Sequence, residues 1–156
     1  MFVDGGRSGE LVIGVEEESW ISDSGATSHA TPSAAHMSSY RRVKETLRIA
    51  SGQVLPIVGR GNLSITFRTR EGNASLAVLN VAHAPELHYN LFSLTRVADA
   101  GHKYVGDREG INVYLKTGGV LNMPSNGRLN YLHGSRNDLN ASPSVNANFR
   151  GESSKN

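Results

Sequence analysis

The sequence contains no cysteine, only 6% aromatic residues and no long hydrophobic run. The absence of cysteine excludes a disulfide framework, an iron–sulfur cluster, a thiolate nucleophile and a cysteine-bearing zinc finger. No apolar stretch approaches the roughly 20 residues that a membrane-spanning helix needs. The opening segment MFVDGGRSGELVIGVEEESW lacks the basic start and apolar core of a signal peptide. We therefore expect a soluble, intracellular protein.

Charge is nearly balanced, with 16 basic and 14 acidic residues and a formal net charge of +2. This is too weak a bias to indicate a nucleic-acid-binding protein by itself. A local basic cluster of Arg41, Arg42, Lys44 and Arg48 is most simply a solvated face, with binding of RNA or an acidic partner as the alternative. Hydrophobic residues make up 38% of the chain, which is enough to form a core.

Composition divides the chain into a folded part and two looser ends. Residues 1–9 are glycine-rich and polar, and we expect a flexible N-terminal arm. Residues 135–156 are rich in serine and asparagine, with few large apolar groups to offset the entropy of ordering, which indicates a flexible tail or linker. The folded domain is therefore expected over residues 10–134.

Within this region apolar and polar residues alternate, which is typical of half-buried strands. Leu63, Ile65 and Phe67 precede a turn at residues 71–73, and further apolar residues follow to Val81, which predicts a β-hairpin. A second predicted hairpin has a small, mobile tip at residues 50–53. Its strands are marked by two apolar pairs, Leu47 with Ile49 and Leu55 with Ile57.

Short strands are expected over residues 103–105, 111–115, 120–123 and 129–132, and one helix over residues 93–100. Ser93 or Asn90 would cap the helix, and Gly101 would end it. Many short, closely spaced strands predict a mostly β barrel or sandwich. We interpret Gly59 and Gly61 as positions of a backbone kink or close packing, because the surrounding residues do not complete a phosphate-binding loop.

The most informative motif is Asp23-Ser24-Gly25-Ala26, which follows an apolar strand. Glycine lets the backbone turn closely, and its N–H can hydrogen-bond the carboxylate and fix its orientation. Two such loops face to face would bring two aspartates together, and these would share one proton because both cannot readily ionise. The charged carboxylate would then act as general base on a water molecule, and the protonated one as general acid on a peptide carbonyl.

The segment WISDSGATSHAT resembles the protease region of copia-type retrotransposon polyproteins, which are retropepsin-like aspartic proteases. The resemblance continues in order and covers about residues 18–133. It is carried by LRIASG at residues 47–52, IVGRG at residues 57–61 with its Gly-x-Gly, VLNVAHAPELHYNLFS at residues 78–93, the helix ending at Gly101, and Tyr131-Leu132.

The resemblance implies a retropepsin-like closed β-barrel with one short helix and half an active site per chain. It implies that Asp23 is the catalytic residue, that Ser24, Gly25, Ala26 and Thr27 complete its loop, and that no metal or cofactor takes part. The residues of an implied flap are Ile49, Ala50, Ser51, Gly52 and Gln53, and those of an implied supporting segment are Asn90, Leu91, Phe92 and Ser93.

The sequence has no second Asp-(Ser/Thr)-Gly motif, so a protease of this kind must be a homodimer in which Asp23 meets its own copy. The implied substrate is an extended peptide from the element's own polyprotein, and the implied location is cytoplasmic, within virus-like particles. A different hypothesis is a catalytically inactive barrel kept as a binding or assembly module. This hypothesis rests on the single half-site and on the stretch Ala82-His83-Ala84, which departs from the pattern of the family. A barrel that binds nucleic acid through residues 41–48 is a third, weaker hypothesis.

Overall fold

The computed structural model describes residues 17–69, 72–138 and 145–146. The elements, in chain order, are β1 (Glu17–Asp23), β2 (Ala30–Thr31), β3 (Ser38–Arg48), β4 (Val54–Thr69), β5 (Gly72–His83), β6 (Asn90–Ser93), α1 (Leu94–Asp99), β7 (Lys103–Asp107), β8 (Gly110–Tyr114), β9 (Val120–Pro124), β10 (Tyr131–Arg136) and β11 (Val145–Asn146).

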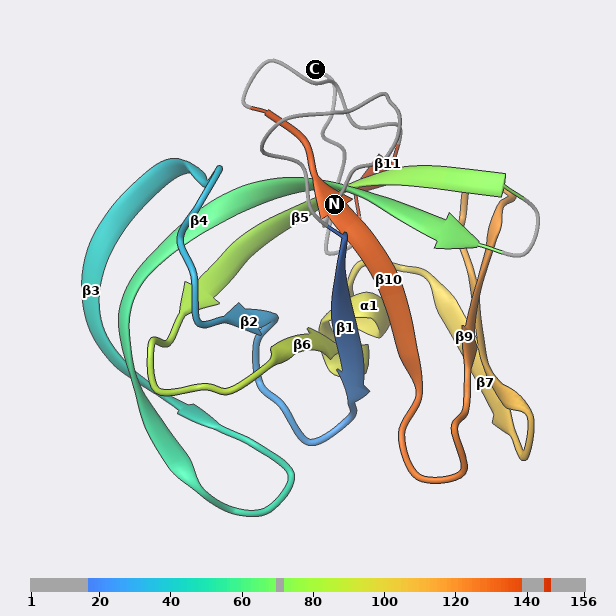
Figure 1. The fold of residues 1–156 in the computed structure, drawn as a ribbon, viewed down its shortest axis with the longest axis horizontal. Helices are drawn as coiled ribbons and strands as arrows, with labels where there is room; N and C mark the ends of the chain where they lie inside the picture. Colours follow the sequence, from blue (N-terminus) through green and yellow to red (C-terminus); the bar gives the residue numbers. More distant parts are fainter. Residues whose placement is uncertain (1–16, 70–71, 139–144, 147–156) are drawn as a thin grey trace, which may run out of the picture.

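Six strands close into a β-barrel (Figure 1). Around the ring the order is β5, β2, β6, β1, β10 and β4, and β4 pairs back with β5. β3 and β11 extend this sheet beside β4 and β5, and β7, β8 and β9 form a separate three-stranded sheet. The predicted fold class, a mostly β closed barrel with one short helix, is thus confirmed. None of the described residues forms a helix long and apolar enough to cross a membrane.

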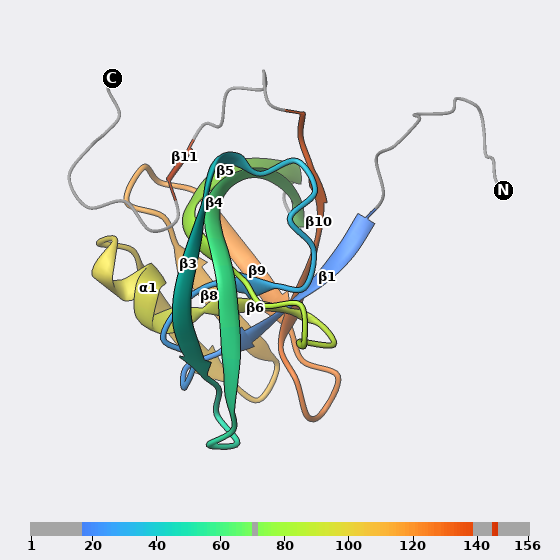
Figure 2. The same cartoon turned by 90° about the vertical axis from the view of Figure 1, so that its left-hand side faces the viewer.

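Both predicted hairpins are present. β4 pairs with β5 in antiparallel register from Gly59↔His83 to Thr69↔Gly72. β3 pairs with β4 from Ser38↔Asn62 to Arg48↔Val54, and Figure 2 shows these two strands running side by side to their tip at the bottom of the view. The predicted close packing at the glycines of β4 is also found, because a side chain at Gly59 would collide with Tyr40 and one at Gly61 with Met37.

The later strands are found where the sequence predicts them, with boundaries that differ by one or two residues at β7, β8 and β9 and by more at β10. β10 begins at Tyr131 rather than residue 129, because Ser125 and Asn130 bridge to each other and enclose a turn. It continues through Arg136, past residue 134, where the sequence analysis ended the folded part. The predicted arm at residues 1–9 lies outside the described residues, as do residues 139–144 and 147–156 of the predicted tail.

Sequence patterning did not reveal β2 and β6. Each has at most four residues, and every one of them is buried, so neither shows the alternation by which a half-buried strand is found. Yet β6 is central to the barrel, since it pairs in parallel with β1 and antiparallel with β2.

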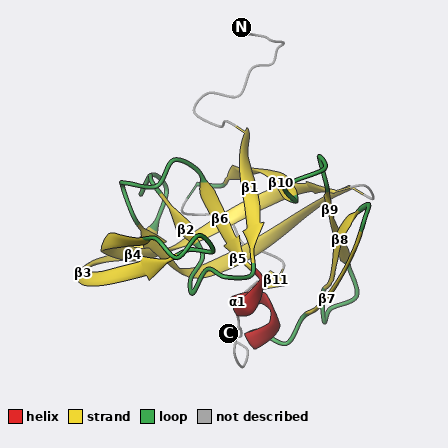
Figure 3. Ribbon diagram, turned by 90° about the horizontal axis from the view of Figure 1, so that it is seen from below, coloured by secondary structure: helices red, strands yellow, loops and turns green. Residues whose placement is uncertain are grey.

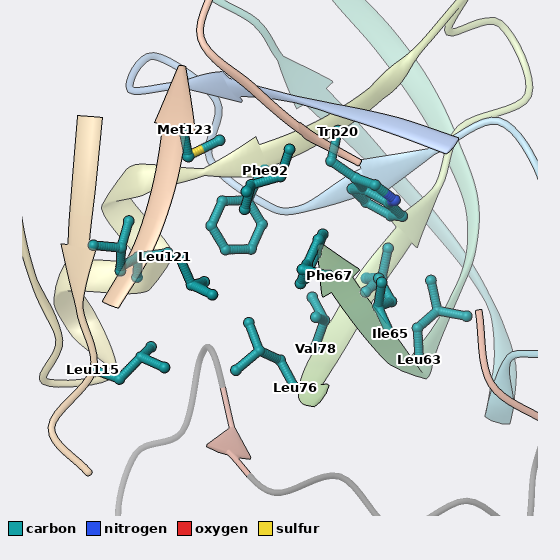
Figure 4. Packing of buried hydrophobic residues seen from close by; sticks show 14 of the residues in the cluster. Trp20, Leu63, Ile65, Phe67, Leu76, Val78, Phe92, Leu115, Leu121 and Met123 are labelled. Atoms are coloured by element: carbon teal, nitrogen blue, oxygen red, sulfur yellow. The ribbon is translucent and has the colours of Figure 1, made fainter. Parts of the chain in front are cut away.

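Hydrophobic residues form two clusters. A barrel cluster fills the space between the strands and the β7–β9 sheet, and Figure 4 shows Trp20, Phe67 and Phe92 side by side at its centre. A hairpin cluster lies under the β3–β4 hairpin. Its members are Ala26, Ala30, Leu47, Ile49, Leu55, Ile57, Ala82, Ala84, Leu87 and Leu91. The apolar pairs that predicted this hairpin are therefore the residues that attach it to the barrel.

A buried polar network joins four strands of the barrel around Arg136. Its guanidinium donates to Glu18 on β1 at 2.7 Å and to Thr31 on β2 at 2.7 Å. Asn90 on β6 donates to Glu18 at 2.9 Å and accepts from Thr31 at 2.7 Å. The Arg136 side chain is only 5% exposed, so the carboxylate of Glu18 is the partner that makes this buried charge tolerable.

We predict that Arg136→Met lowers the free energy of unfolding by about 3 kcal/mol, because it leaves Glu18 poorly compensated and removes a buried network. The matched control is Arg68→Met, which breaks the neighbouring pair with Glu17, where the side chains are 61% and 43% exposed. That exposed pair should contribute less than about 1 kcal/mol. Urea unfolding measures both variants, and equal losses would contradict the importance of the buried network.

Candidate active site

Asp23 is the last residue of β1, and its position is fixed by the neighbouring strand β6. The two strands run in parallel, with Trp20 opposite Asn90 and Asp23 opposite Ser93. β6 then leads directly into α1, so the chain turns into a helix beside the carboxylate. Figure 3, seen from below, shows α1 at the ends of β1 and β6. This end of the barrel therefore gathers the Asp23 loop and the helix.

The Asp23 carboxylate is held by backbone N–H groups on both oxygens. Gly25 donates to Oδ1 at 2.8 Å, the bond that the sequence predicted. Ala50, at the tip of the β3–β4 hairpin, donates to Oδ2 at 3.4 Å. Asp23 is half-buried. Its orientation is therefore set by its own loop and by a segment distant in the sequence.

The loop is also tied to the elements beneath it. The Ser93 hydroxyl donates to the carbonyl of Ala26 at 2.9 Å, and the Thr95 hydroxyl donates to the carbonyl of Ser24 at 3.1 Å. The same Ser93 oxygen caps α1 by accepting the backbone N–H of Arg96. The predicted helix cap at Ser93 is thus confirmed, and this cap also anchors the Asp23 loop.

The tip of the hairpin is a tight turn that rests on the loop. Ile49 donates to the carbonyl of Gln53 at 3.1 Å, and Gly52 donates to the carbonyl of Ile49 at 2.9 Å. Gly52 has a φ of 90°, which glycine adopts readily. A Cβ atom on Gly25 would lie 2.9 Å from the Ala50 Cα atom. The absence of a side chain at Gly25 is what allows the tip to reach Asp23.

An open cleft of about 630 Å³ lies between Asp23 and the hairpin tip. The β9–β10 loop also reaches this end of the molecule (Figure 1). The residues that line the cleft are Ile21, Ser22, Asp23, Ser24, Ile49, Ala50, Ser51, Gln53, Tyr89, Leu91 and Leu129. The arrangement combines one oriented carboxylate with an apolar wall, which suits an extended ligand whose backbone lies over the carboxylate.

Half of the residues implied by the resemblance line the cleft, namely Asp23, Ser24, Ile49, Ala50, Ser51, Gln53 and Leu91. Ala26, Phe92 and Ser93 are buried and Gly25 faces Ala50 of the hairpin tip, so none of the four lines the cleft. Gly52 belongs to the tip turn, and Thr27 is exposed beyond the loop.

Other placements differ from the sequence analysis. Asn90, the first residue of the implied supporting segment, takes part in the Arg136 network. Sequence reasoning missed Ile21, Tyr89 and Leu129 as lining residues. Leu129 carried no signal, because only the β9–β10 loop brings it there.

His29 is a buried titratable group close to the loop. It is 1% exposed, its ring stacks on Phe92 with centroids 5.0 Å apart, and its Nδ1 accepts the backbone N–H of Ser93 at 3.0 Å. Burial and the nearby Arg96 guanidinium lower the pKa of His29 to about 3. The imidazole is therefore neutral in the folded protein at ordinary pH.

Within the described part of the chain, no group of three or more His, Cys, Asp or Glu side chains is placed to hold a metal ion. The basic residues Arg41, Arg42, Lys44 and Arg48 are exposed on β3, and none of them lines the cleft.

We predict that Gly25→Ala displaces the hairpin tip, because the added methyl group would overlap Ala50 and crowd the Asp23 carboxylate at 3.3 Å. Overpacking of this kind costs about 1–3 kcal/mol. The measurement is urea unfolding together with amide chemical shifts of residues 49–53. Gly106→Ala on β7, whose new Cβ atom would meet Ile111 at an ordinary 3.4 Å, is the control and should leave both unchanged. An undisturbed tip in Gly25→Ala would show that the contact with Ala50 is not maintained.

Stability should also depend on pH through His29. Between pH about 6.5 and about 3 the unfolded chain carries a proton on this residue and the folded chain does not, so the free energy of unfolding falls as pH falls. The contribution is about 1.4 kcal/mol per pH unit within that window. His29→Asn cannot titrate and should have a shallower slope by that amount in urea unfolding at several pH values. If the free energy of unfolding depends on pH equally in the parent and in His29→Asn, the pKa of His29 is not lowered by folding.

Comparison with known proteins places this chain in a family. The family described as "Pol polyprotein, beta-barrel domain" matches residues 20–102, from the core of β1 to just beyond α1. The chain is also 30% identical over 83 residues to the "Retrovirus-related Pol polyprotein from transposon RE1" of Arabidopsis thaliana, a match that covers 52% of this chain and 5% of that polyprotein. No solved structure matches significantly. The chain therefore belongs to the Pol polyprotein β-barrel domain family and corresponds to a small part of a retrotransposon polyprotein.

Proposed function

We propose that this domain is a homodimeric aspartic endopeptidase of a copia-type retrotransposon that cleaves junctions in the element's own polyprotein. The observation that carries the proposal is the Asp23 carboxylate, which ends a barrel strand, accepts the Gly25 N–H at 2.8 Å and faces a cleft. A carboxylate oriented by a glycine N–H at an open cleft is suited to general acid–base chemistry. Membership of a Pol polyprotein family agrees with a substrate of this origin.

The homodimer follows from the number of carboxylates. Hydrolysis of a peptide by water needs one group to accept a proton and another to donate one, and each chain supplies a single Asp-Ser-Gly motif. A twofold axis that passes beside Asp23 would place the two copies of this residue in contact, with the same loop contributed from both sides. Each subunit would then hold half of the active site.

The reaction we propose proceeds without a covalent intermediate. One Asp23 carboxylate accepts a proton from a water molecule, whose oxygen attacks the scissile carbonyl carbon, while the protonated Asp23 of the other subunit donates its proton to the carbonyl oxygen. The resulting diol then collapses. The Asp23 that took the proton from water gives it to the amide nitrogen, and the carbon–nitrogen bond breaks. One hydroxyl of the diol returns its proton to the other Asp23, so that the pair again holds one proton.

The hairpin tip would control access to this centre. In the single chain Ala50 already donates to Asp23 Oδ2, so the tip must lift for a second Asp23 and a substrate to reach the carboxylate. After binding, the tip would close over the peptide and exclude water. The substrate would lie extended in the cleft, against the apolar side chains of Ile21, Tyr89 and Leu129.

We predict that Asp23→Asn lowers cleavage of a polyprotein-junction peptide by about 10²–10⁴-fold, the usual contribution of positioned acid–base catalysis. Asp99→Asn is the control, because that carboxylate is 62% exposed on α1 and pairs with Arg96 in the same helix. It should retain full activity. The measurement is the initial rate of peptide hydrolysis at equal protein concentration.

The same preparation tests the dimer. Activity per chain should rise with protein concentration as subunits associate, and addition of excess Asp23→Asn protein should suppress it by forming mixed dimers. If the protein sediments as a monomer and cleaves no peptide, the catalytic proposal fails and the alternative, a barrel that serves as a binding or assembly module, is favoured.

A further inference from the structure

His29 is a buried titratable group that the proposed reaction does not use. It lies between the Asp23 loop and β2, in the same WISDSGATSHAT segment as Asp23. Its Nδ1 accepts a backbone N–H, which defines the neutral ring with its proton on Nε2. Nε2 is buried without a hydrogen-bond partner in the described part of the chain. A buried polar atom without a partner is unfavourable, and the bond at Nδ1 is therefore the polar contact that holds the ring among the described residues.

The contact made by that nitrogen leads to the Asp23 loop in two steps. His29 Nδ1 accepts from the Ser93 N–H at 3.0 Å, and the Ser93 hydroxyl donates to the Ala26 carbonyl at 2.9 Å. Ala26 in turn donates its backbone N–H to the carbonyl of Asp23 at 3.3 Å. Ser93 is also the residue opposite Asp23 in the β1–β6 pairing. A shift of Ser93 would therefore disturb both its hydrogen bond to the Ala26 carbonyl and its pairing opposite Asp23.

His29 is held in place through both its ring and its backbone. It stacks on Phe92 at 5.0 Å, and the backbone carbonyl of His29 accepts from Ala82 on β5 at 2.8 Å. His29 thus joins β5, β6 and the Asp23 loop. An apolar ring of similar size could fill the same space, but it would leave the Ser93 N–H without an acceptor.

We propose that His29 is a positioning residue for the Asp23 loop, a neutral imidazole whose Nδ1 fixes Ser93 and, through Ser93, the Ala26 carbonyl. This inference rests on the proposed function for its catalytic consequence, although its structural part stands independently. The same contact sets a lower limit on the pH at which the Asp23 loop is supported. Protonation at Nδ1 removes the acceptor, so the loop should lose its support near pH 3. The charged group that acts on the ring is Arg96 on α1, which is itself paired with Asp99 at 3.5 Å.

The first test needs no variant. Long-range nitrogen–proton NMR spectra of the full chain at neutral pH should show His29 protonated at Nε2 and bare at Nδ1, with the Ser93 amide protected from hydrogen exchange. A proton on Nδ1, or a Ser93 amide that exchanges as freely as a surface loop, overturns the proposal.

The second test compares two substitutions. His29→Phe keeps an aromatic ring and removes the acceptor, whereas His29→Asn keeps an acceptor near the position of Nδ1 and removes the titration. We expect Ser93 exchange to accelerate at least about tenfold in His29→Phe and to stay within about threefold of the parent in His29→Asn. For peptide cleavage we expect kcat to fall by about tenfold or more in His29→Phe with little change in KM, and His29→Asn to retain activity to lower pH than the parent.

The outcomes separate the two proposals. If the parent protein cleaves no peptide, the proposed function fails, while the Ser93 exchange rates still decide the role of His29. If the parent cleaves and His29→Phe has the same kcat and the same Ser93 protection, the positioning role fails and the proposed function stands. If His29→Phe does not fold, the NMR spectra of the parent and the rate of peptide cleavage by His29→Asn decide the positioning role of His29. Complete loss of cleavage in His29→Asn would contradict that role.

Discussion

The parallel pairing of β6 with the end of β1 is the constraint on which the site depends. It places Ser93 opposite Asp23, and Ser93 then caps α1, holds the Ala26 carbonyl and donates to His29. A strand of only four residues, all buried, therefore joins the barrel, the helix and the Asp23 loop. Because these contacts are short and mutually supporting, displacement of any one of them would alter the orientation of the carboxylate.

The region around Asp23 combines a rigid base with a more weakly attached cover. The base is packed between the two hydrophobic clusters and contains the buried groups Phe92, Ser93 and His29. The cover is the hairpin tip at residues 50–53, which is exposed and touches the carboxylate through one long hydrogen bond of 3.4 Å. Segments with few buried contacts open at low free energy, whereas packed strands do not. This difference suits a centre whose carboxylate stays fixed while its cover moves.

The Arg136 network performs a comparable task at the other end of β1. Glu18, Thr31, Asn90 and Arg136 come from four different strands and close the barrel through charge-assisted hydrogen bonds. Their separation along the chain explains why no sequence pattern reveals them. Residue 136 even falls in the segment that composition assigns to a tail, since one buried arginine among serines and asparagines does not raise the local hydrophobicity.

By itself the sequence determined the two hairpins, the helix with its cap at Ser93, and the Asp23-Ser24-Gly25 turn, because alternation, capping and glycine geometry act over a few neighbouring residues. Only the tertiary structure decided that Ala50 would meet Asp23, that Leu129 and Tyr89 would line the cleft, and that His29 and Arg136 would be buried. These facts depend on barrel closure, in which β2 and β6 bring together residues that are distant in the chain, and such short buried strands have no periodicity of their own.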